Sequence, residues 1–262
     1  SDLPYEGFPA QEAGLRAGDV LMKIDDFDTQ GKSIQDVSEK LKGQPGTTIR
    51  VVIKREGAEE LLEKEITRKK IHVPAVPWYG MRDGNIGYIR ISNFTHKVSE
   101  DVKDAIMDLK SQGAESYILD LRGNPGGLLM EAVEIANLFV PKGELIVSTK
   151  GKVKKWNKEY YAQKEPIVPE VPVVVMVNSG SASASEIVSG ALQDLDRGVV
   201  VGTRTFGKGL VQTTRPLSYN ARLKITTAKY YIPSGRCIQA LDYANRKEDG
   251  SVGKIPDSLI TS

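Results

Sequence analysis

Cysteine and histidine are scarce in this chain of 262 residues, which contains one cysteine, Cys237, and two histidines, His72 and His96. A single thiol excludes an internal disulfide framework and any metal site built from several cysteines. No apolar run approaches the length needed to span a bilayer, and no signal peptide is visible. The formal net charge of +2 is too small to indicate nucleic acid or an anionic membrane as a partner.

The remaining composition is that of an ordinary globular protein. Hydrophobic residues make up 40% of the chain and charged residues 27%, which gives no indication of disorder. The length predicts one or two domains, with enough chain for a buried core. The sequence pattern changes near residue 84, and this change favours two domains.

Residues 1–70 predict a compact, β-rich module with two helices. The pattern indicates a helix over residues 9–15, a strand over 20–24, a helix over 34–42 that Gly43 ends, and a strand in "TTIRVVIKR". Residues 71–83, "IHVPAVPWYGMRD", contain two prolines and predict an extended linker.

From residue 84 to about 235, strand and helix patterns alternate, which predicts a right-handed α/β core. The expected strands are "NIGYIRIS", "SYILDL", the fully apolar "VPVVVMVN" and "GVVVGT". The first expected helix, "HKVSEDVKDAIMDLKSQG", has Ser99 as its N-cap and Gly113 as its stop.

Two strand-to-helix turns of this core, "DLRGNPGG" and "NSGSASASE", crowd small residues together. Ligands bind at this edge of open α/β sheets, and amide groups there suit an oxyanion as well as a phosphate. Ser181, Ser183 and Ser185 are candidate nucleophiles, although a plain N-cap role accounts for most serines at a helix start. Glu186, in the first turn of the helix, is interpreted as favouring the helix dipole.

A serine nucleophile needs a base, and neither histidine has a partner nearby in sequence, so a Ser-His-Asp triad is unsupported. A lysine serves instead if burial keeps it neutral. The stretch "GTRTFGKG" carries Lys208 between Gly207 and Gly209, and its apolar flanks allow the lysine to be pressed against the sheet. The same stretch is a poor phosphate-binding loop, because Gly209 stands where a hydroxyl should hold magnesium.

The segments "GFPAQEAGLRAGDVLMKIDD" and "LKGQPGTTIRVVIKR" resemble a PDZ domain. Such domains take a peptide C-terminus as an added strand, whereas the alternative is a packing or regulatory module without a ligand. In the resemblance, a first strand and a carboxylate-binding loop should precede Pro4, so residues 1–70 are expected to be an incomplete PDZ-like domain.

The segments "YILDLRGNPGGLLMEAVEIANLFV", "VVVMVNSGSASASEIVSGALQD", "VVVGTRTFGKGLVQT" and "LKITTAKYYIPSGRCIQ" resemble the carboxyl-terminal processing proteases, also called tail-specific proteases. This resemblance implies an α/β fold with a Clp protease/crotonase-like βαβ core over residues 84–262, incomplete at its C-terminus, behind the PDZ-like module. It implies a serine endopeptidase that cuts protein substrates near their C-termini.

Carried over residue by residue, the resemblance makes Ser183 the nucleophile, Lys208 the general base and Gln212 the residue that orients the lysine. The amides of Ala184 and of Gly127, chosen over Gly126, would stabilise the oxyanion. No metal, nucleotide or other cofactor is implied.

The implied partners are protein or peptide substrates bound through their C-termini, with self-association into a homo-oligomer left open. Family members are usually exported, so the resemblance implies the periplasm or cell envelope. The alternative is a non-catalytic peptide- or ligand-binding module on the same fold. Arg122 is interpreted as the ion-pair partner of Asp120 or of a nearby acid, and Cys237 as a residue without a nucleophilic role.

Overall fold

The computed structural model describes residues 4, 7–70 and 74–255. The chain divides into two compact units between residues 73 and 74. Each unit has a hydrophobic core of its own.

The first unit is a four-stranded antiparallel sheet with two short helices. The strand order is β2-β1-β3-β4, with β1 (Val20–Ile24), β2 (Phe27–Asp28), β3 (Thr48–Lys54) and β4 (Leu62–Thr67). Helices α1 (Pro9–Glu12) and α2 (Ile34–Leu41) complete it. Alternate residues of β3 point into the core, as expected for a half-buried strand, so Ile49, Val51 and Ile53 are buried. The predicted β-rich module with two helices is therefore present.

The main sheet of the second unit has five strands in the order β11-β10-β7-β6-β5. Strands β6 (Ile86–Arg90), β7 (Ser116–Asp120), β10 (Val173–Val177) and β11 (Val199–Gly202) are parallel, as the alternating pattern predicts. Strand β5 (Trp78–Arg82) is antiparallel to β6, so the predicted extended linker over 71–83 is wrong for these five residues. A hairpin turn through Gly84 and Asn85, both at positive φ, folds β5 back onto the sheet.

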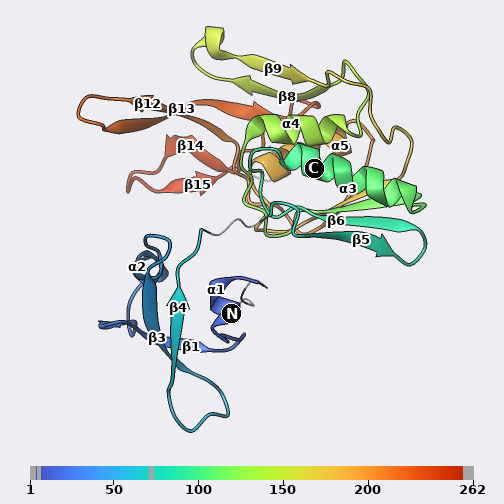
Figure 1. Cartoon of the computed structure of the whole chain (residues 1–262). Helices are drawn as coiled ribbons and strands as arrows, with labels where there is room; N and C mark the ends of the chain where they lie inside the picture. The colour runs from blue at the N-terminus through green and yellow to red at the C-terminus, as the bar shows by residue number, and fades with distance from the viewer. Residues whose placement is uncertain (1–3, 5–6, 71–73, 256–262) are drawn as a thin grey trace. The chain divides into compact units, whose positions relative to one another are not determined.

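Three helices and a second sheet pack around the main sheet. Helices α3 (Val98–Ser111), α4 (Leu129–Asn137) and α5 (Ala184–Asp194) share one hydrophobic core with it. Helices α4 and α5 also contact β8, and Figure 1 shows them between the two sheets. The second sheet has the order β12-β13-β8-β9, with β8 (Leu145–Lys150), β9 (Lys158–Tyr161), β12 (Leu210–Pro216) and β13 (Arg222–Tyr231). A 3₁₀ turn (Lys154–Trp156) and the pair β14 (Leu241–Arg246) and β15 (Val252–Lys254) complete the elements of the described residues.

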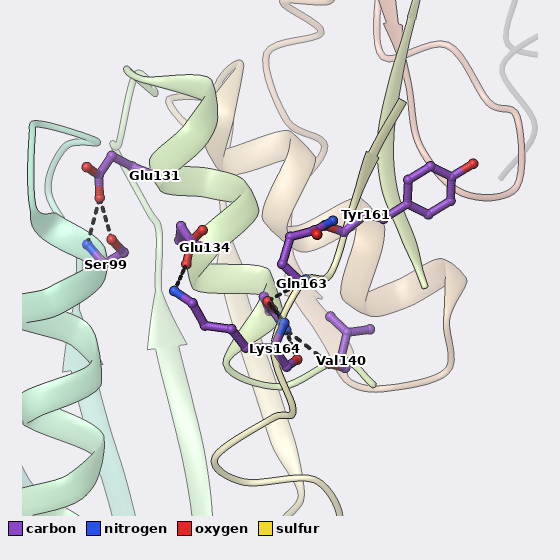
Figure 2. A network of polar contacts seen from close by, with 8 residues as sticks. Ser99, Glu131, Glu134, Val140, Tyr161, Gln163 and Lys164 are labelled. Atoms are coloured by element: carbon purple, nitrogen blue, oxygen red, sulfur yellow. Dashed lines mark hydrogen bonds and ion pairs between the residues drawn. The ribbon is translucent and has the colours of Figure 1, made fainter. Parts of the chain in front are cut away.

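Helix α3 begins one residue before the predicted cap. Its N-cap is Lys97 at φ 73°, and Ser99 lies inside the first turn, so the predicted N-cap is wrong. The amide and hydroxyl of Ser99 donate instead to Glu131 of α4, at 2.9 and 2.6 Å (Figure 2). A carboxylate from a neighbouring helix satisfies the donors that a local cap would otherwise take.

Candidate active site

The turn between β10 and α5, taken with the first three residues of α5 (residues 178–186) and here called the serine turn, holds Ser183 in an unusual backbone conformation. Ser183 has φ 56° and ψ −110°, a region that residues with a side chain rarely adopt. Strain of this kind costs about 1–3 kcal/mol and persists only where the surroundings enforce it. Ser183 is half-buried and stands at the N-cap of α5.

The structure distinguishes the three candidate serines. Ser181 and Ser185 are fully buried, and their hydroxyls donate to the carbonyls of Leu121 and Asn124, at 2.8 and 3.0 Å. Both therefore tie the serine turn to the turn that follows β7. Ser183 is the one of the three that solvent reaches.

The turn after β7, residues 121–127 and here called the glycine turn, packs directly on the serine turn. Buried Asn124 fixes it by donating to the carbonyl of Ile91 at 2.8 Å and accepting from the amide of Gly126 at 2.9 Å. A Cβ atom on Gly126 would lie 2.8 Å from Cβ of Ser183 and 2.9 Å from the amide nitrogen of Ala184. Glycine is required there because no side chain fits between the two turns.

Two backbone amides, one directly after Ser183 and one directly after Gly126, have no internal acceptor in the described part of the chain. Among the hydrogen bonds of the described residues, none is donated by the amide of Gly127 or by that of Ala184. The amide of Gly126 is already used by Asn124, and Gly127 is exposed whereas Gly126 is buried. This difference favours Gly127 over Gly126 as a donor to a bound oxyanion.

Lys208 lies in the loop between β11 and β12, residues 203–209 and here called the lysine loop. The amide of Phe206 donates to the carbonyl of Ser181 at 2.9 Å, which ties the loop to the serine turn. On its other side, the amide of Gly209 donates to Oε1 of Gln239 at 2.9 Å, and the carbonyl of Gly207 accepts from Ala240 at 3.0 Å. The backbone around Lys208 is thus held between the serine turn on one side and residues 239–240 on the other.

Glu186 links the serine turn to the lysine loop through several side-chain hydrogen bonds. Its carboxylate is buried, at 5% exposure, and Oε2 accepts from the amides of Ser183 at 2.7 Å and Lys208 at 2.9 Å. Oε1 accepts from the amide of Gly207 at 2.6 Å and the hydroxyl of Thr205 at 2.7 Å. The interpretation of Glu186 as a helix-dipole residue alone was therefore incomplete. The Ser-x-x-Glu spacing could have predicted the contact with Ser183 but not those with the lysine loop.

The side chain of Lys208 is exposed, so the expectation that it is pressed against the sheet is wrong. Its neighbours Gly207 and Gly209 have no side chains to cover it, and Phe206 is itself 62% exposed. In the part of the chain that the structure describes, no hydrogen bond joins Lys208 Nζ to Ser183 or to Gln212. Gln212 is exposed on β12, opposite Thr226 of β13.

Arg122 takes part in a structural ion pair, whereas His96 lies at the surface. Asp120 accepts from Arg122 Nη2 at 2.8 Å, which confirms the expected ion pair. Burial alone would raise the pKa of the Asp120 carboxyl, but hydrogen bonds from Arg122 and Tyr88 hold that pKa below its ordinary value. His96 is exposed, with Nδ1 4.0 Å from Glu131. His72 lies outside the described residues.

Comparison with known proteins decides the family. The profile of peptidase family S41 matches residues 85–244, and that of a PDZ domain matches residues 2–55. The chain belongs to peptidase family S41. The family inferred from the sequence motifs is thereby confirmed, and so is an α/β fold with an N-terminal PDZ domain.

Two curated relatives are similar over most of this chain. A carboxy-terminal-processing protease of Bartonella bacilliformis is 43% identical, over 91% of this chain and 55% of its own length. A carboxyl-terminal-processing protease of Synechocystis is 39% identical, over 98% of this chain and 58% of its own length. The chain thus spans just over half the length of these relatives.

Solved structures agree on the fold. A photosystem II D1 C-terminal processing protease superposes with a TM-score of 0.61 at 34% identity, over 90% of this chain and 64% of that one. An S41 protein from Bacteroides fragilis has a TM-score of 0.62 at 20% identity, over 88% and 65%, which supports the fold alone. None of the helices in the described residues is long and apolar enough to cross a membrane.

Proposed function

We propose that this S41 chain carries a serine endopeptidase that cleaves protein substrates near their C-termini with Ser183 and Lys208. The observation that carries the proposal is the convergence of three features at one point. A strained, accessible serine precedes the amide of Ala184 and packs on the glycine turn that carries the amide of Gly127, and one carboxylate accepts from the backbone of both the serine and the lysine. The names of the similar processing proteases support the same reaction class.

The proposed reaction is acyl transfer through the hydroxyl of Ser183. Neutral Lys208 Nζ takes the hydroxyl proton while Oγ attacks the scissile carbonyl carbon. The tetrahedral intermediate collapses, the C–N bond breaks and the lysine returns the proton to the leaving amine. Water, deprotonated by Lys208 Nζ, then attacks the ester carbonyl, and Nζ returns the proton to Oγ as the acid product leaves Ser183.

The amides of Gly127 and Ala184 are the proposed donors to the oxyanion. Preorganised backbone donors are effective because they need no reorientation as negative charge develops on the carbonyl oxygen. Among the described residues, neither amide donates to an internal acceptor, so both can donate to a ligand oxygen. This is consistent with the proposed role.

The proposal requires the exposed side chain of Lys208 to turn toward Ser183 when substrate binds. The backbone needs no large movement, because Lys208 and Ser183 already donate to the same oxygen of Glu186. A bound substrate would cover Lys208 and remove it from water, which favours the neutral amine that a general base must be. Gln212 is then the proposed residue that orients the amine.

The PDZ unit is proposed to receive the substrate's C-terminus and to deliver it or control access to the site. It contains a cavity of about 660 Å³ lined by apolar side chains that include Leu15, Leu21 and Ile49. Arg16 and Lys42 also line this cavity and would attract a terminal carboxylate. An extracytoplasmic location is proposed from the exported character of the family. Protein or peptide substrates are the proposed partners, and the net charge of +2 gives no reason to propose nucleic acid.

The test is cleavage of an unstructured protein with an apolar C-terminal tail by the parent chain, Ser183→Ala and Lys208→Ala. Loss of cleavage in both variants, with binding of the tail peptide retained, supports the Ser-Lys peptidase. A parent chain that binds the tail without cutting it supports the non-catalytic binding module instead. Cleavage that survives Ser183→Ala would remove Ser183 from the mechanism.

A further inference from the structure

We infer that Glu186 is a positioning residue of the reaction, which sets the distance between the nucleophile's turn and the lysine loop. The inference rests on the proposed function for its effect on cleavage. Its structural part stands independently, because Glu186 joins its own turn to Lys208, which lies 22 positions later in the sequence.

The four contacts of Glu186 divide between its two oxygen atoms. Oε2 accepts the amides of Ser183 and Lys208, so the backbone of both proposed reacting residues converges on one atom. Oε1 accepts the amide of Gly207 and the hydroxyl of Thr205, which fixes the lysine loop on the preceding side. A shift of the carboxylate would therefore move Lys208 relative to Ser183.

A carboxylate suits this position better than any other side chain of similar size. In its ionised form a carboxylate only accepts hydrogen bonds, and all four neighbours of Glu186 are donors. Glutamine has the same shape, but its NH₂ group would face two of these donors and repel them. Aspartate keeps the acceptors but is one methylene shorter, so it cannot span the same gap.

Glu186 also contributes to the helix start, so an effect on activity must be separated from an effect on folding. Glu131 offers a matched control in the same unit. Its half-buried carboxylate accepts the amides of Lys97 and Ser99 and the hydroxyl of Ser99, at 2.8, 2.9 and 2.6 Å. It joins α4 to the start of α3 with the same chemistry, as Figure 2 shows for Ser99, but it holds neither Ser183 nor Lys208.

The experiment compares the parent chain with Glu186→Gln and Glu131→Gln in three measurements. Urea unfolding is followed by tryptophan fluorescence, since both tryptophans, Trp78 and Trp156, lie in the second unit. The cleavage constants kcat and KM are measured on the unstructured substrate. Hydrogen exchange is measured on peptides that cover residues 203–209.

We expect both variants to lower the unfolding midpoint, but only Glu186→Gln to change the reaction. It should lower kcat about 100-fold with KM unchanged, because a misplacement of about 1 Å in a reacting group costs this much. It should also speed amide exchange in residues 203–209. Glu131→Gln should keep kcat near the parent value and leave exchange in that segment unaltered.

A Glu186→Gln chain with the parent's kcat and the parent's exchange in residues 203–209 would overturn the inference. Equal losses of kcat in the two variants would overturn it as well, since the effect would then follow stability. If Glu186→Gln does not fold, Glu186→Asp is judged by the same criteria. If the parent does not cleave, the proposed function fails, and the exchange measurement still decides whether Glu186 positions the loop.

Discussion

The hydroxyl of Ser185 donates a hydrogen bond of 3.0 Å to the carbonyl of Asn124. The same carbonyl accepts the amide of Ala182 at 3.0 Å, so one oxygen of the glycine turn holds the serine turn on both sides of Ser183. This contact explains how an S41 chain keeps Ser183 at a strained backbone conformation. It also separates the serines that build the site from the one that is proposed to react.

The three serines should therefore respond differently to alanine. Ser181→Ala leaves the amide of Asn178 without a partner and removes one of the two donors to the carbonyl of Leu121, so it should cost about 1–3 kcal/mol of unfolding free energy. Folded Ser181→Ala should still cleave. Ser183→Ala should unfold close to the parent midpoint and lose cleavage. Urea unfolding by tryptophan fluorescence, with cleavage assays below the transition, measures both quantities. The reverse pattern would contradict the assignment of roles.

Substitution of Gly126 should disturb the site more than substitution of a nearby glycine of the same turn. A Cβ on Gly126 meets the carbonyl oxygen of Ala182 at 2.6 Å, and φ is +95°. Gly126→Ala should lower kcat at least about 100-fold, since it pushes the two turns apart. Gly123→Ala is the control, because φ is +72° but no atom lies within 4 Å of its Cβ. Its effect should be confined to backbone strain, about 1 kcal/mol. Equal kcat in the two variants would show that the close packing is dispensable.

Lys208→Arg should abolish cleavage although it keeps the positive charge. An arginine stays protonated in proteins and cannot take the proton of Ser183. If Lys208 acted only through its charge, the variant would remain active. Lys110→Arg, an exposed site on α3, is the control and should leave kcat unchanged. Cleavage assays on the folded variants decide between a base and a charge.

In the PDZ unit, the pKa of the Asp19 carboxyl should lie below the ordinary value of an aspartate. Its hydrogen bonds from Arg55, at 2.7 and 2.8 Å, lower its pKa from 3.8 to about 2. Because the folded-state pKa is depressed, the pair stabilises this unit above about pH 4 and loses that effect as the pH falls toward 2. Arg55→Gln should return the midpoint toward 3.8, as measured by carboxyl carbon NMR. A midpoint that does not move would show that Arg55 is not the cause.

Much of the α/β framework followed from local sequence pattern. Apolar runs such as "VPVVVMVN" and the small-residue turns after them predicted strands, helices and the edge where the candidate site lies. The errors came from distant contacts. Strand β5 forms because it pairs with β6, and Ser99 is not the N-cap of α3 because Glu131 of α4 accepts its donors. The second sheet joins β8 to β13, which are far apart in the chain, and no local pattern indicates that pairing.

The sequence by itself determined the family, because the serine and lysine motifs and the PDZ-like segments are short, contiguous and specific. Only the tertiary structure decided which serine is accessible, which glycine amide is already used, and that Glu186 reaches the lysine loop. It also revealed that the side chain of Lys208 is exposed. These properties depend on which distant segments pack together, and burial and hydrogen bonding across such contacts leave no periodicity in the sequence.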